Sequence, residues 1–449
     1  MNLLYRSLLF SLLLVSFSAG AQVFKAGAGR KVITPALPYH LTGYASRTEP
    51  AKEKVHDLWA KALVIESSAT GKVAIVTTDV LGLTPEIHKE VVGRLSKLGF
   101  QRSQIILNSS HTHSGPMIWP SLAMIGDYDS ATVKGFRRYK DFLVNSIVEV
   151  VDQASRNMFT AKLSSGHGTA TFAMNRRQLV NGKIINGKNP EGSTDHDVPV
   201  LKVQDANGNV KAVLFGYACH NTTIGGNNYL INGDYAGFAQ IEVERSFPGA
   251  TALFFTGCAG DQNPQPRGTI ELAEKHGHEL ATSVNNVLAQ KLKPVNGAIK
   301  SDLQETTLRF VPFSAEKYQE ALMSDNVFEQ RRARLMLEAY NRGWDVTKYD
   351  YPIQAMRIGN SLTFVSLAGE VVVDYALKLK KMYPRENFFI AGYCNHVMGY
   401  IPTKKVLEEG GYEADDNLIY YGMPGPFAKD VESRIFAAIS KILKGLGVK

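Results

Sequence analysis

Short apolar runs rich in Val, Ile and Phe recur along the chain, and many of them end in turn residues. Runs of this kind are typical of buried strands. The predicted strands cover residues 62–67, 73–80, 103–110, 198–203, 211–218, 251–257, 362–369 and 386–393. Between the runs, apolar residues recur at three- and four-residue spacing, which indicates helices. The predicted helices span 85–99, 136–155, 271–292 and 370–382, and a last amphipathic helix covers 429–447.

The order of these elements predicts an α/β fold built from mixed β-sheets with flanking helices. Turns at 69–72 (ATGK) and 205–209 (DANGN) join neighbouring strands into hairpins, whereas other strands alternate with helices. Residues 314–345 are expected to form one or two exposed helices inserted before the last strands. The sequence shows no internal repeat or Pro/Ser-rich linker, so we interpret residues 22–449 as a single domain, with two intimately packed halves as the alternative.

Residues 1–21 differ in composition from the rest of the chain. One arginine precedes a leucine-rich stretch that ends in Ala-Gly-Ala, the pattern of a cleavable secretory signal peptide. No later stretch approaches the ~20 uninterrupted apolar residues that a membrane-spanning helix needs. We therefore expect a mature protein without a transmembrane anchor, located in a bacterial periplasm or secreted.

Charge and cysteine content add two weaker constraints. The formal net charge is +8, but the basic residues are scattered and no nucleic-acid-binding motif accompanies them. A mild positive excess could favour an anionic surface or substrate. Cys219, Cys258 and Cys394 are too few for a disulfide framework. Export would permit one bridge, but buried unpaired thiols are the simpler interpretation.

Three histidines follow predicted strands. In HTHSGP (111–116), His111 and His113 stand one residue apart, and an extended backbone would place them on the same side. They could then converge on one metal ion, or one could bind the metal while the other acts as an acid or base. Capping and ordinary hydrogen bonding remain the alternative. His220 follows the apolar run VLFGYA at another strand end, where sites of α/β sheets tend to lie.

Other polar residues near strand ends complete the candidate chemistry. Asp261 and Asn263 follow the strand at 251–257, and Asp261 could serve a site or simply hydrogen-bond its own backbone. Glu370 is predicted in the first turn of the helix at 370–382, where it would stabilise the helix dipole. Tyr400 lies in a long polar loop after the last strand. Long loops in compact domains are often functional.

Taken in order, these stretches resemble the neutral/alkaline non-lysosomal ceramidases, zinc amidases that cleave the N-acyl bond of ceramide. The resemblance runs over roughly residues 25–440. It is carried by GAGRKVITPALPYHLTGYASR (27–47), HTHSGP (111–116), the pair Asn175-Arg176, NGDYAGF (232–238), GCAGD (257–261), LAGE (367–370) and NHVMGYIPT (395–403).

The resemblance implies a site with one catalytic Zn²⁺. Matched motif by motif, the zinc ligands would be His111, His220, Glu370 and Tyr400, and the choice of His111 over His113 rests on the resemblance alone. Nitrogen and oxygen ligands of this kind suit zinc. The other expected site residues are His113 as a proton shuttle, Asp261 as an orienting group or base, and Asn263 and Arg176 as substrate-positioning groups.

Two departures from the family pattern affect the expected function. A serine of the family's GDxSPN-like segment is replaced by Asn263, which leaves metal-activated water as the attacking group. Family members also carry a C-terminal β-sandwich domain, whereas this chain ends soon after the last motif. We expect hydrolysis of an N-acyl amide in a small amphipathic or glycan-like substrate, either a sphingolipid or another N-acylated molecule such as an amino sugar. The alternatives are zinc-dependent cleavage of an ester or glycosidic bond, for example in a glycan, and a catalytically silent ligand-binding protein.

Overall fold

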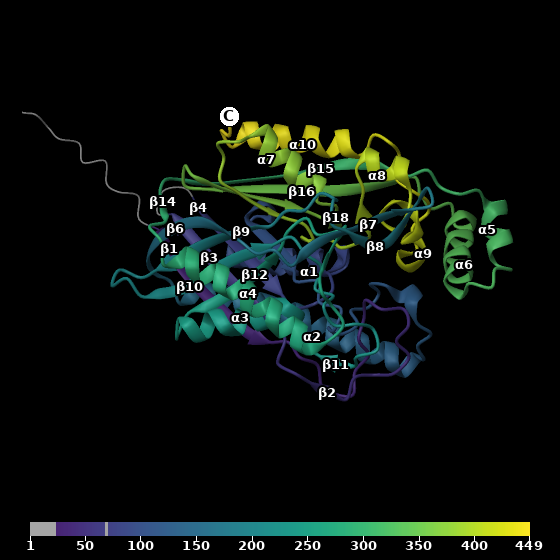
Figure 1. The fold of residues 1–449 in the computed structure, drawn as a ribbon, viewed down its shortest axis with the longest axis horizontal. Coiled ribbons are helices and arrows are strands. Elements are labelled where there is room, and N and C mark those ends of the chain that lie inside the picture. The colour runs from purple at the N-terminus through teal and green to yellow at the C-terminus, as the bar shows by residue number, and fades with distance from the viewer. Residues whose placement is uncertain (1–23, 68–70) are drawn as a thin grey trace, which may run out of the picture.

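A nine-stranded mixed sheet forms the centre of the molecule (Figure 1). The computed structural model describes residues 24–67 and 71–449, so the expected signal peptide lies outside the described residues. The strand order is β12-β10-β9-β6-β1-β3-β4-β5, and β14 pairs with β6. The bounds are β1 (Phe24–Val32), β3 (Trp59–Ser67), β4 (Gly71–Thr78), β5 (Ile105–Ser109), β6 (Phe159–Thr169), β9 (Asp197–Gln204), β10 (Val210–Tyr217), β12 (Thr251–Thr256) and β14 (Lys293–Val295).

A second, four-stranded sheet packs on one face of the first. Its order is β15 (Ile299–Arg309), β16 (Lys348–Ile358), β17 (Leu362–Leu367) and β19 (Phe388–Ala391). Side chains alternate between the two faces of a strand. Along β3, Leu63 therefore faces the second sheet, in a buried cluster with Phe364 and Phe389, while Ala62 and Val64 face the helices on the other side.

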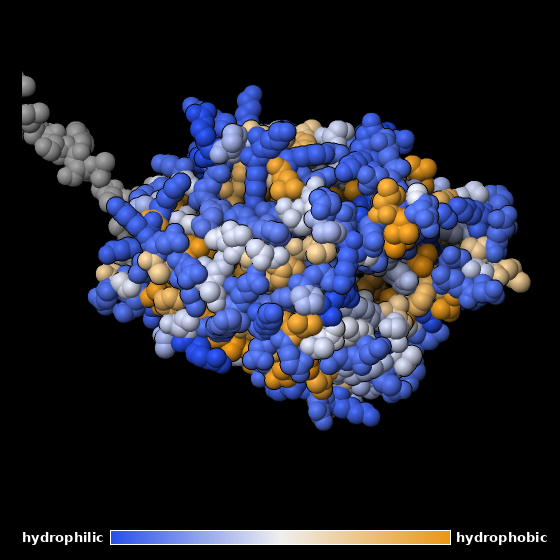
Figure 2. Space-filling model, viewed as in Figure 1, coloured by the Kyte–Doolittle hydropathy of each residue, from blue (hydrophilic) through white to orange (hydrophobic). Residues whose placement is uncertain are grey.

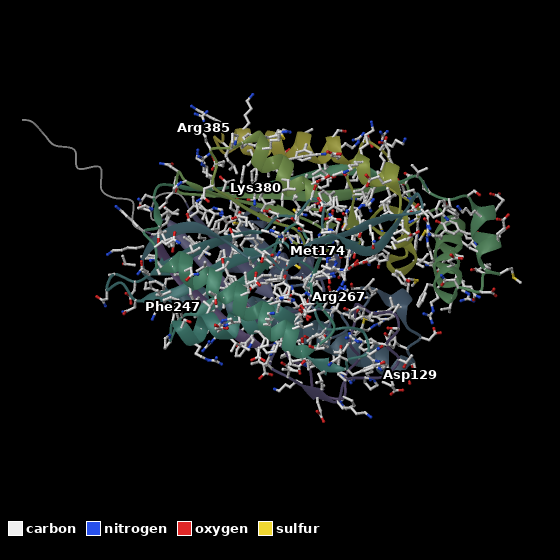
Figure 3. The ribbon with its side chains drawn as sticks, viewed as in Figure 1. Asp129, Met174, Phe247, Arg267, Lys380 and Arg385 are labelled. Carbon is white, nitrogen blue, oxygen red and sulfur yellow. The ribbon has the colours of Figure 1, made fainter. Side chains whose placement is uncertain are left out.

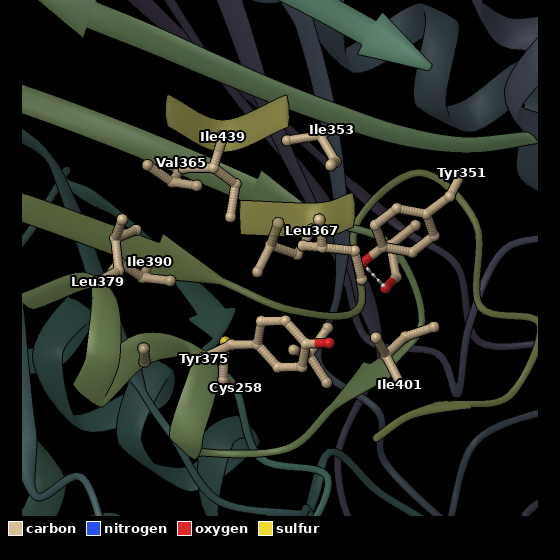
Figure 4. Packing of buried hydrophobic residues seen from close by; sticks show 14 of the residues in the cluster. Cys258, Tyr351, Ile353, Val365, Leu367, Tyr375, Leu379, Ile390, Ile401 and Ile439 are labelled. Atoms are coloured by element: carbon tan, nitrogen blue, oxygen red, sulfur yellow. Dashed lines mark hydrogen bonds between the residues drawn. The ribbon is translucent and has the colours of Figure 1, made fainter. Parts of the chain in front are cut away.

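Helices cover both outer faces, so the layers run helix, sheet, sheet, helix (Figure 1). On the nine-stranded sheet, α1 (Pro85–Leu95) and α2 (Ser130–Arg156) pack against β3 and β4, and α3 (Asp234–Ser246) and α4 (Ile270–Leu288) pack against β9, β10 and β12. On the four-stranded sheet lie α7 (Asp374–Met382) and α10 (Val431–Gly445), where Tyr375 and Ile439 pack on Leu367 (Figure 4). The predicted fold class is confirmed.

Smaller elements connect and extend these layers. Three small sheets are formed by β13 (Gln262–Pro264), β7 (Ala173–Val180) and β8 (Lys183–Asn189), by β2 (Glu53–Lys54) and β11 (Leu230–Ile231), and by β18 (Glu370–Val371) and β20 (Tyr400–Ile401). The predicted helices within 314–345 are α5 (Ala315–Ala321) and α6 (Val327–Asn341), which project from one end (Figure 1). The remaining helical segments are α8 (Lys404–Glu409), a π-helical turn (Tyr412–Asp416), α9 (Leu418–Tyr421) and three 3₁₀ turns (Ser96–Leu98, Arg102–Gln104, Ala123–Ile125).

The two edges of the nine-stranded sheet meet at Asn108. Although β5 and β12 stand at opposite ends of the strand order, the backbone N–H of Thr256 donates to Asn108 Oδ1 (2.9 Å). Asn108 Nδ2 also donates to the carbonyl of Gly392 (2.8 Å), in the loop after β19. The side chain of Asn108 is fully buried. These bonds gather the carboxyl ends of β5, β12 and β19 at one place.

The surface is mainly hydrophilic on the face shown, and the three cysteines lie in the interior. The face shown in Figure 2 is largely hydrophilic, with small apolar groups scattered over it. Cys219, Cys258 and Cys394 are all buried and unpaired, as expected. Within residues 24–67 and 71–449, none of the helices combines the length and apolarity that crossing a bilayer requires.

Candidate metal centre

Strand ends of both sheets deliver the candidate side chains to one place. His111 and His113 follow β5, His220 follows β10, Glu370 follows β17, and Tyr400 follows β19. Glu370 Oε2 lies 3.1 Å from His111 Nε2 and 3.0 Å from His220 Nε2. His220 Nε2 lies 3.3 Å from the Tyr400 hydroxyl, and His113 Nε2 lies 3.1 Å from His111 Nε2. The ligand atoms of the three histidines lie within 4.8 Å of one another, so this group could hold a metal ion.

Backbone contacts fix the orientation of two of these imidazoles. His111 Nδ1 lies 2.6 Å from the carbonyl of Leu81, and His220 Nδ1 lies 2.7 Å from the carbonyl of Ala259. A carbonyl only accepts, so each Nδ1–H donates and each Nε2 presents a lone pair to the Glu370 carboxylate. Lone pairs and a carboxylate that converge in this way fit a cation, and metal-binding histidines commonly donate their second N–H to such an acceptor. His113 differs, because its buried Nδ1 has no hydrogen-bond partner among the described residues.

Local backbone geometry differs from the sequence expectation at two positions. His111 has a φ of +62°, so the two histidines of HTHSGP converge through a left-handed residue rather than an extended strand. Glu370 was predicted in the first turn of a helix, and that prediction is wrong. Glu370 pairs in parallel with Tyr400 in the β18–β20 sheet, and α7 begins only at Asp374. The reason is Gly369, whose φ of +76° ends the preceding run and turns the chain toward this pairing.

The electrostatics of the centre follow from complete burial. Burial alone would raise the pKa of Glu370, but His111 and His220 hold it well below its ordinary value. Tyr421 supports the carboxylate by donating its hydroxyl proton to Oε1. Burial, together with Arg176, lowers the pKa of His220 to about 4, and burial with the two neighbouring histidines holds the pKa of His113 well below 6.5. The pKa of Glu370 falls only where positive charge lies beside it. A metal ion would supply that charge and leave the imidazoles neutral, which are the protonation states that a metal site requires.

Arg176 reaches the centre from β7. Its Nε donates to Glu413 Oε1 (2.7 Å), and Arg177 Nη1 donates to the other oxygen of the same carboxylate (2.7 Å). Arg176 Nη1 lies 3.4 Å from Asn263 Oδ1, and the guanidinium stands 5.4 Å from the centre of the Tyr400 ring. Asn263 thus lies next to the centre and contacts Arg176.

Asp261 lies behind the centre and ties together the loops around it. Its Oδ1 accepts from the backbone N–H of Val373 (2.8 Å), and its Oδ2 accepts from Asn175 Nδ2 (3.3 Å). Burial raises the pKa of Asp261 to about 7. These partners lie in loops or strands adjoining Glu370 and Arg176, so the carboxyl group joins three segments of the site.

A cavity of about 240 Å³ opens onto the centre. Sequence reasoning missed several residues of the site, above all Glu413, Tyr421 and Arg267. The available signal was the concentration of Tyr and acidic residues at 412–421 within the long polar loop. The cavity is lined by Gly43, Tyr44, Ala45, Leu81, His111, His113, Leu122, Ile125, Arg176, Asn186, Thr222, Asn263, Arg267, Glu370, Tyr400, Tyr412, Tyr420 and Tyr421.

The chain is similar in sequence to several neutral ceramidases. The chain is 28% identical over 279 residues to a neutral ceramidase of Pseudomonas aeruginosa, a match that covers 58% of this chain and 40% of that protein. It is 27% identical over 272 residues to neutral ceramidase B of Dictyostelium discoideum, covering 56% of this chain and 37% of that protein. The matched region thus spans well under half the length of these relatives.

The fold is shared over a longer stretch. The crystal structure of neutral ceramidase from Pseudomonas aeruginosa superposes with a TM-score of 0.73 at 20% identity, covering 95% of this chain and 74% of that chain. The model of the family described as neutral/alkaline non-lysosomal ceramidase, N-terminal, matches residues 24–307, which is more than half of this chain. The protein therefore belongs to the neutral/alkaline non-lysosomal ceramidase family.

Proposed function

We propose that this protein is an exported zinc-dependent hydrolase that cleaves an N-acyl amide bond. The observation that carries the proposal is the convergence of His111 Nε2, His220 Nε2 and Glu370 Oε2, with both Nδ1 atoms committed to backbone carbonyls. Neutral imidazoles and a carboxylate form a donor set that suits zinc. The relatives named above are ceramidases, which supports an amide as the bond.

In this proposal the ligands are His111, His220, Glu370 and Tyr400, and His113 acts on protons. The assignment is supported by the environment of the ring nitrogens. His111 and His220 have a carbonyl behind them, as metal-binding histidines usually do, whereas His113 has no partner at Nδ1 among the described residues. Bound zinc would act as a Lewis acid. It would polarise a carbonyl group and lower the pKa of water to near neutrality.

The chain's own residues divide the remaining work. His113 takes a proton from the attacking water and returns one to the leaving nitrogen. Arg176 Nη2 is buried and has no acceptor in the described part of the structure, so it can donate to the carbonyl oxygen of the substrate, where negative charge develops. Asn263 and Glu413 hold the Arg176 guanidinium in place, and Asp261 joins the supporting loops.

The apolar side chains of Leu81, Leu122 and Ile125 line one part of the cavity and suit an acyl chain. We propose export through the signal peptide at residues 1–21, and a single domain over 22–449. The substrate is then a small amphipathic N-acyl compound.

Removal and return of the metal test this function. Purified mature protein should release dodecanoate from N-dodecanoylethanolamine, lose this activity with a chelator, and recover it with one equivalent of zinc. Hydrolysis that persists at full rate in the metal-free protein would contradict the proposal. Zinc-dependent cleavage of a glycoside or ester substrate, with no cleavage of any amide, would instead favour the alternative bond.

A further inference from the structure

Arg267 is a charged residue of the cavity that the catalytic assignment does not use. Three lining residues carry a fixed charge, namely Arg176, Arg267 and Glu370. Arg176 is paired with Glu413, and Glu370 faces His111 and His220. Arg267 makes no hydrogen bond or ion pair with any residue in 24–67 or 71–449. The lining thus carries one positive charge without a counter-charge.

The backbone on both sides of Arg267 is held by hydrogen bonds. Gly268 N–H donates to the carbonyl of Thr223 (2.7 Å), three residues after His220. On the other side, His276 Nε2 lies 2.7 Å from the carbonyl of Pro266. In Figure 3, Arg267 lies near the middle of the view, between the β7–β8 hairpin and α2. Arg267 is half-buried, and its fixed backbone limits the conformational freedom that is lost when the side chain binds a ligand.

The apolar and the polar residues that line the cavity come from different segments of the chain. Leu81, Leu122 and Ile125 pack in one apolar cluster, whereas Asn263 and Arg267 come from the segment that follows β12. An acyl chain on the apolar residues would leave the group on the amide nitrogen to the polar ones. A guanidinium binds carboxylate, sulfonate or phosphate oxygens through paired N–H groups.

We propose that Arg267 selects substrates whose amine portion carries an anionic group. This inference rests on the proposed amidase function and adds the substrate class, N-acyl compounds with an acidic head group. Arg267 would contact that group directly and act as a specificity residue, with no part in the bond cleavage itself.

The test compares three N-dodecanoyl compounds that differ in the group on nitrogen: N-dodecanoylglycine, N-dodecanoyltaurine and the neutral N-dodecanoylethanolamine. Binding to the zinc-free protein is measured by calorimetry, and hydrolysis is measured with zinc. The wild type should bind the anionic compounds about 10- to 100-fold more tightly than the neutral one, as expected for a charge-assisted hydrogen-bond pair. Comparison of the glycine and taurine compounds shows whether Arg267 prefers a carboxylate or a sulfonate.

Variants assign the preference to this side chain. Arg267→Gln should remove the preference, so that the anionic compounds bind no more tightly than the neutral one, while Arg267→Lys should retain part of it. Arg385→Gln is the matched control, because Arg385 is exposed and lies far from Arg267 (Figure 3). Equal affinity for all three compounds, no binding of either anionic compound, or a preference that survives in Arg267→Gln would overturn the inference.

The two proposals fail in different ways. Selective binding of the anionic compounds without any zinc-dependent hydrolysis would sustain the role of Arg267 and contradict the amidase function. Zinc-dependent hydrolysis with equal kcat/KM for the anionic and neutral compounds would support the amidase function and contradict the role of Arg267.

Discussion

At the scale of single residues, the contacts of the ring nitrogens divide the three histidines into two groups. His111 and His220 each place a backbone carbonyl behind the imidazole, which fixes the tautomer and aims Nε2 at the centre. Within the described part of the chain, Nδ1 of His113 has no such support, and Arg47 donates to the backbone carbonyl of His113. A metal ligand needs a fixed lone pair, whereas a proton carrier needs a nitrogen that can change its protonation state.

Substitution of His113 separates these roles. We expect His113→Gln to keep its zinc and to lose about 10²- to 10⁴-fold in kcat, the usual range for a lost acid–base group. His111→Gln should lose zinc. Metal analysis and steady-state kinetics on the two variants check this expectation, and release of zinc by His113→Gln would show that His113 is itself a ligand.

Asp261 gives a pH-dependent contribution to stability. Its pKa of about 7 in the folded protein lies above the ordinary value of 3.8. The folded state therefore keeps a proton that the unfolded state releases, and stability falls as pH rises from about 4 to about 7, by at most about 1.4 kcal/mol per pH unit. Asp261→Asn has no carboxyl group to titrate at this position, so its stability lacks this pH-dependent contribution.

Denaturant unfolding of both proteins at about pH 5 and about pH 8 measures this effect. The free energy of unfolding of the wild type, relative to Asp261→Asn, should be lower at the higher pH. A difference between the two proteins that does not change with pH would refute the raised pKa.

At the scale of elements, the buried carboxylate of Glu413 joins β7 to the π-helical turn. Both of its oxygens accept from guanidinium groups, those of Arg176 and Arg177. Glu413→Gln leaves one of these buried cations without an anion, so we expect a loss of about 3–5 kcal/mol in the free energy of unfolding. Glu409→Gln is the control, because Glu409 is part-exposed beside Arg177 and should cost less than about 1 kcal/mol. Equal losses in chemical denaturation would contradict this account.

The sequence pattern predicted the main elements because their periodicity is local. The turn signals at 69–72 and 205–209 predicted that β3 pairs with β4 and β9 with β10, and both pairs are antiparallel. The apolar runs at 103–110 and 211–218 form β5 and β10. Amphipathic spacing identified α2 and α10 for the same reason. These features depend on neighbours within a few residues, which the sequence displays directly.

The details of the site depend on contacts between distant segments, and these could not be predicted. The pairing of Glu370 with Tyr400 joins residues 30 positions apart through two-residue strands, which have no periodicity. The meeting of β5 with β12 at Asn108 depends on the curvature of the whole sheet. Glu413 and Tyr421 lie in a loop whose π-helical turn has no simple sequence signature.

At the scale of the whole molecule, the packing of two sheets explains where the centre forms. The nine-stranded sheet supplies His111, His113 and His220, and the four-stranded sheet supplies the strands that lead to Glu370 and Tyr400. Neither sheet alone contains the full set. Metal binding should therefore stabilise the folded state, because ligands that are far apart in the sequence are brought together only on folding.

The most direct test of the metal centre is the zinc content of the purified protein, measured by mass spectrometry, beside His220→Ala and His278→Ala. His278 is an exposed histidine of α4 that contacts Glu242, so its substitution controls for loss of a histidine outside the centre. We expect about one zinc per chain in the wild type and in His278→Ala, and almost none in His220→Ala when circular dichroism shows it folded. One zinc per chain in folded His220→Ala, or none in zinc-saturated wild type, would contradict the metal centre.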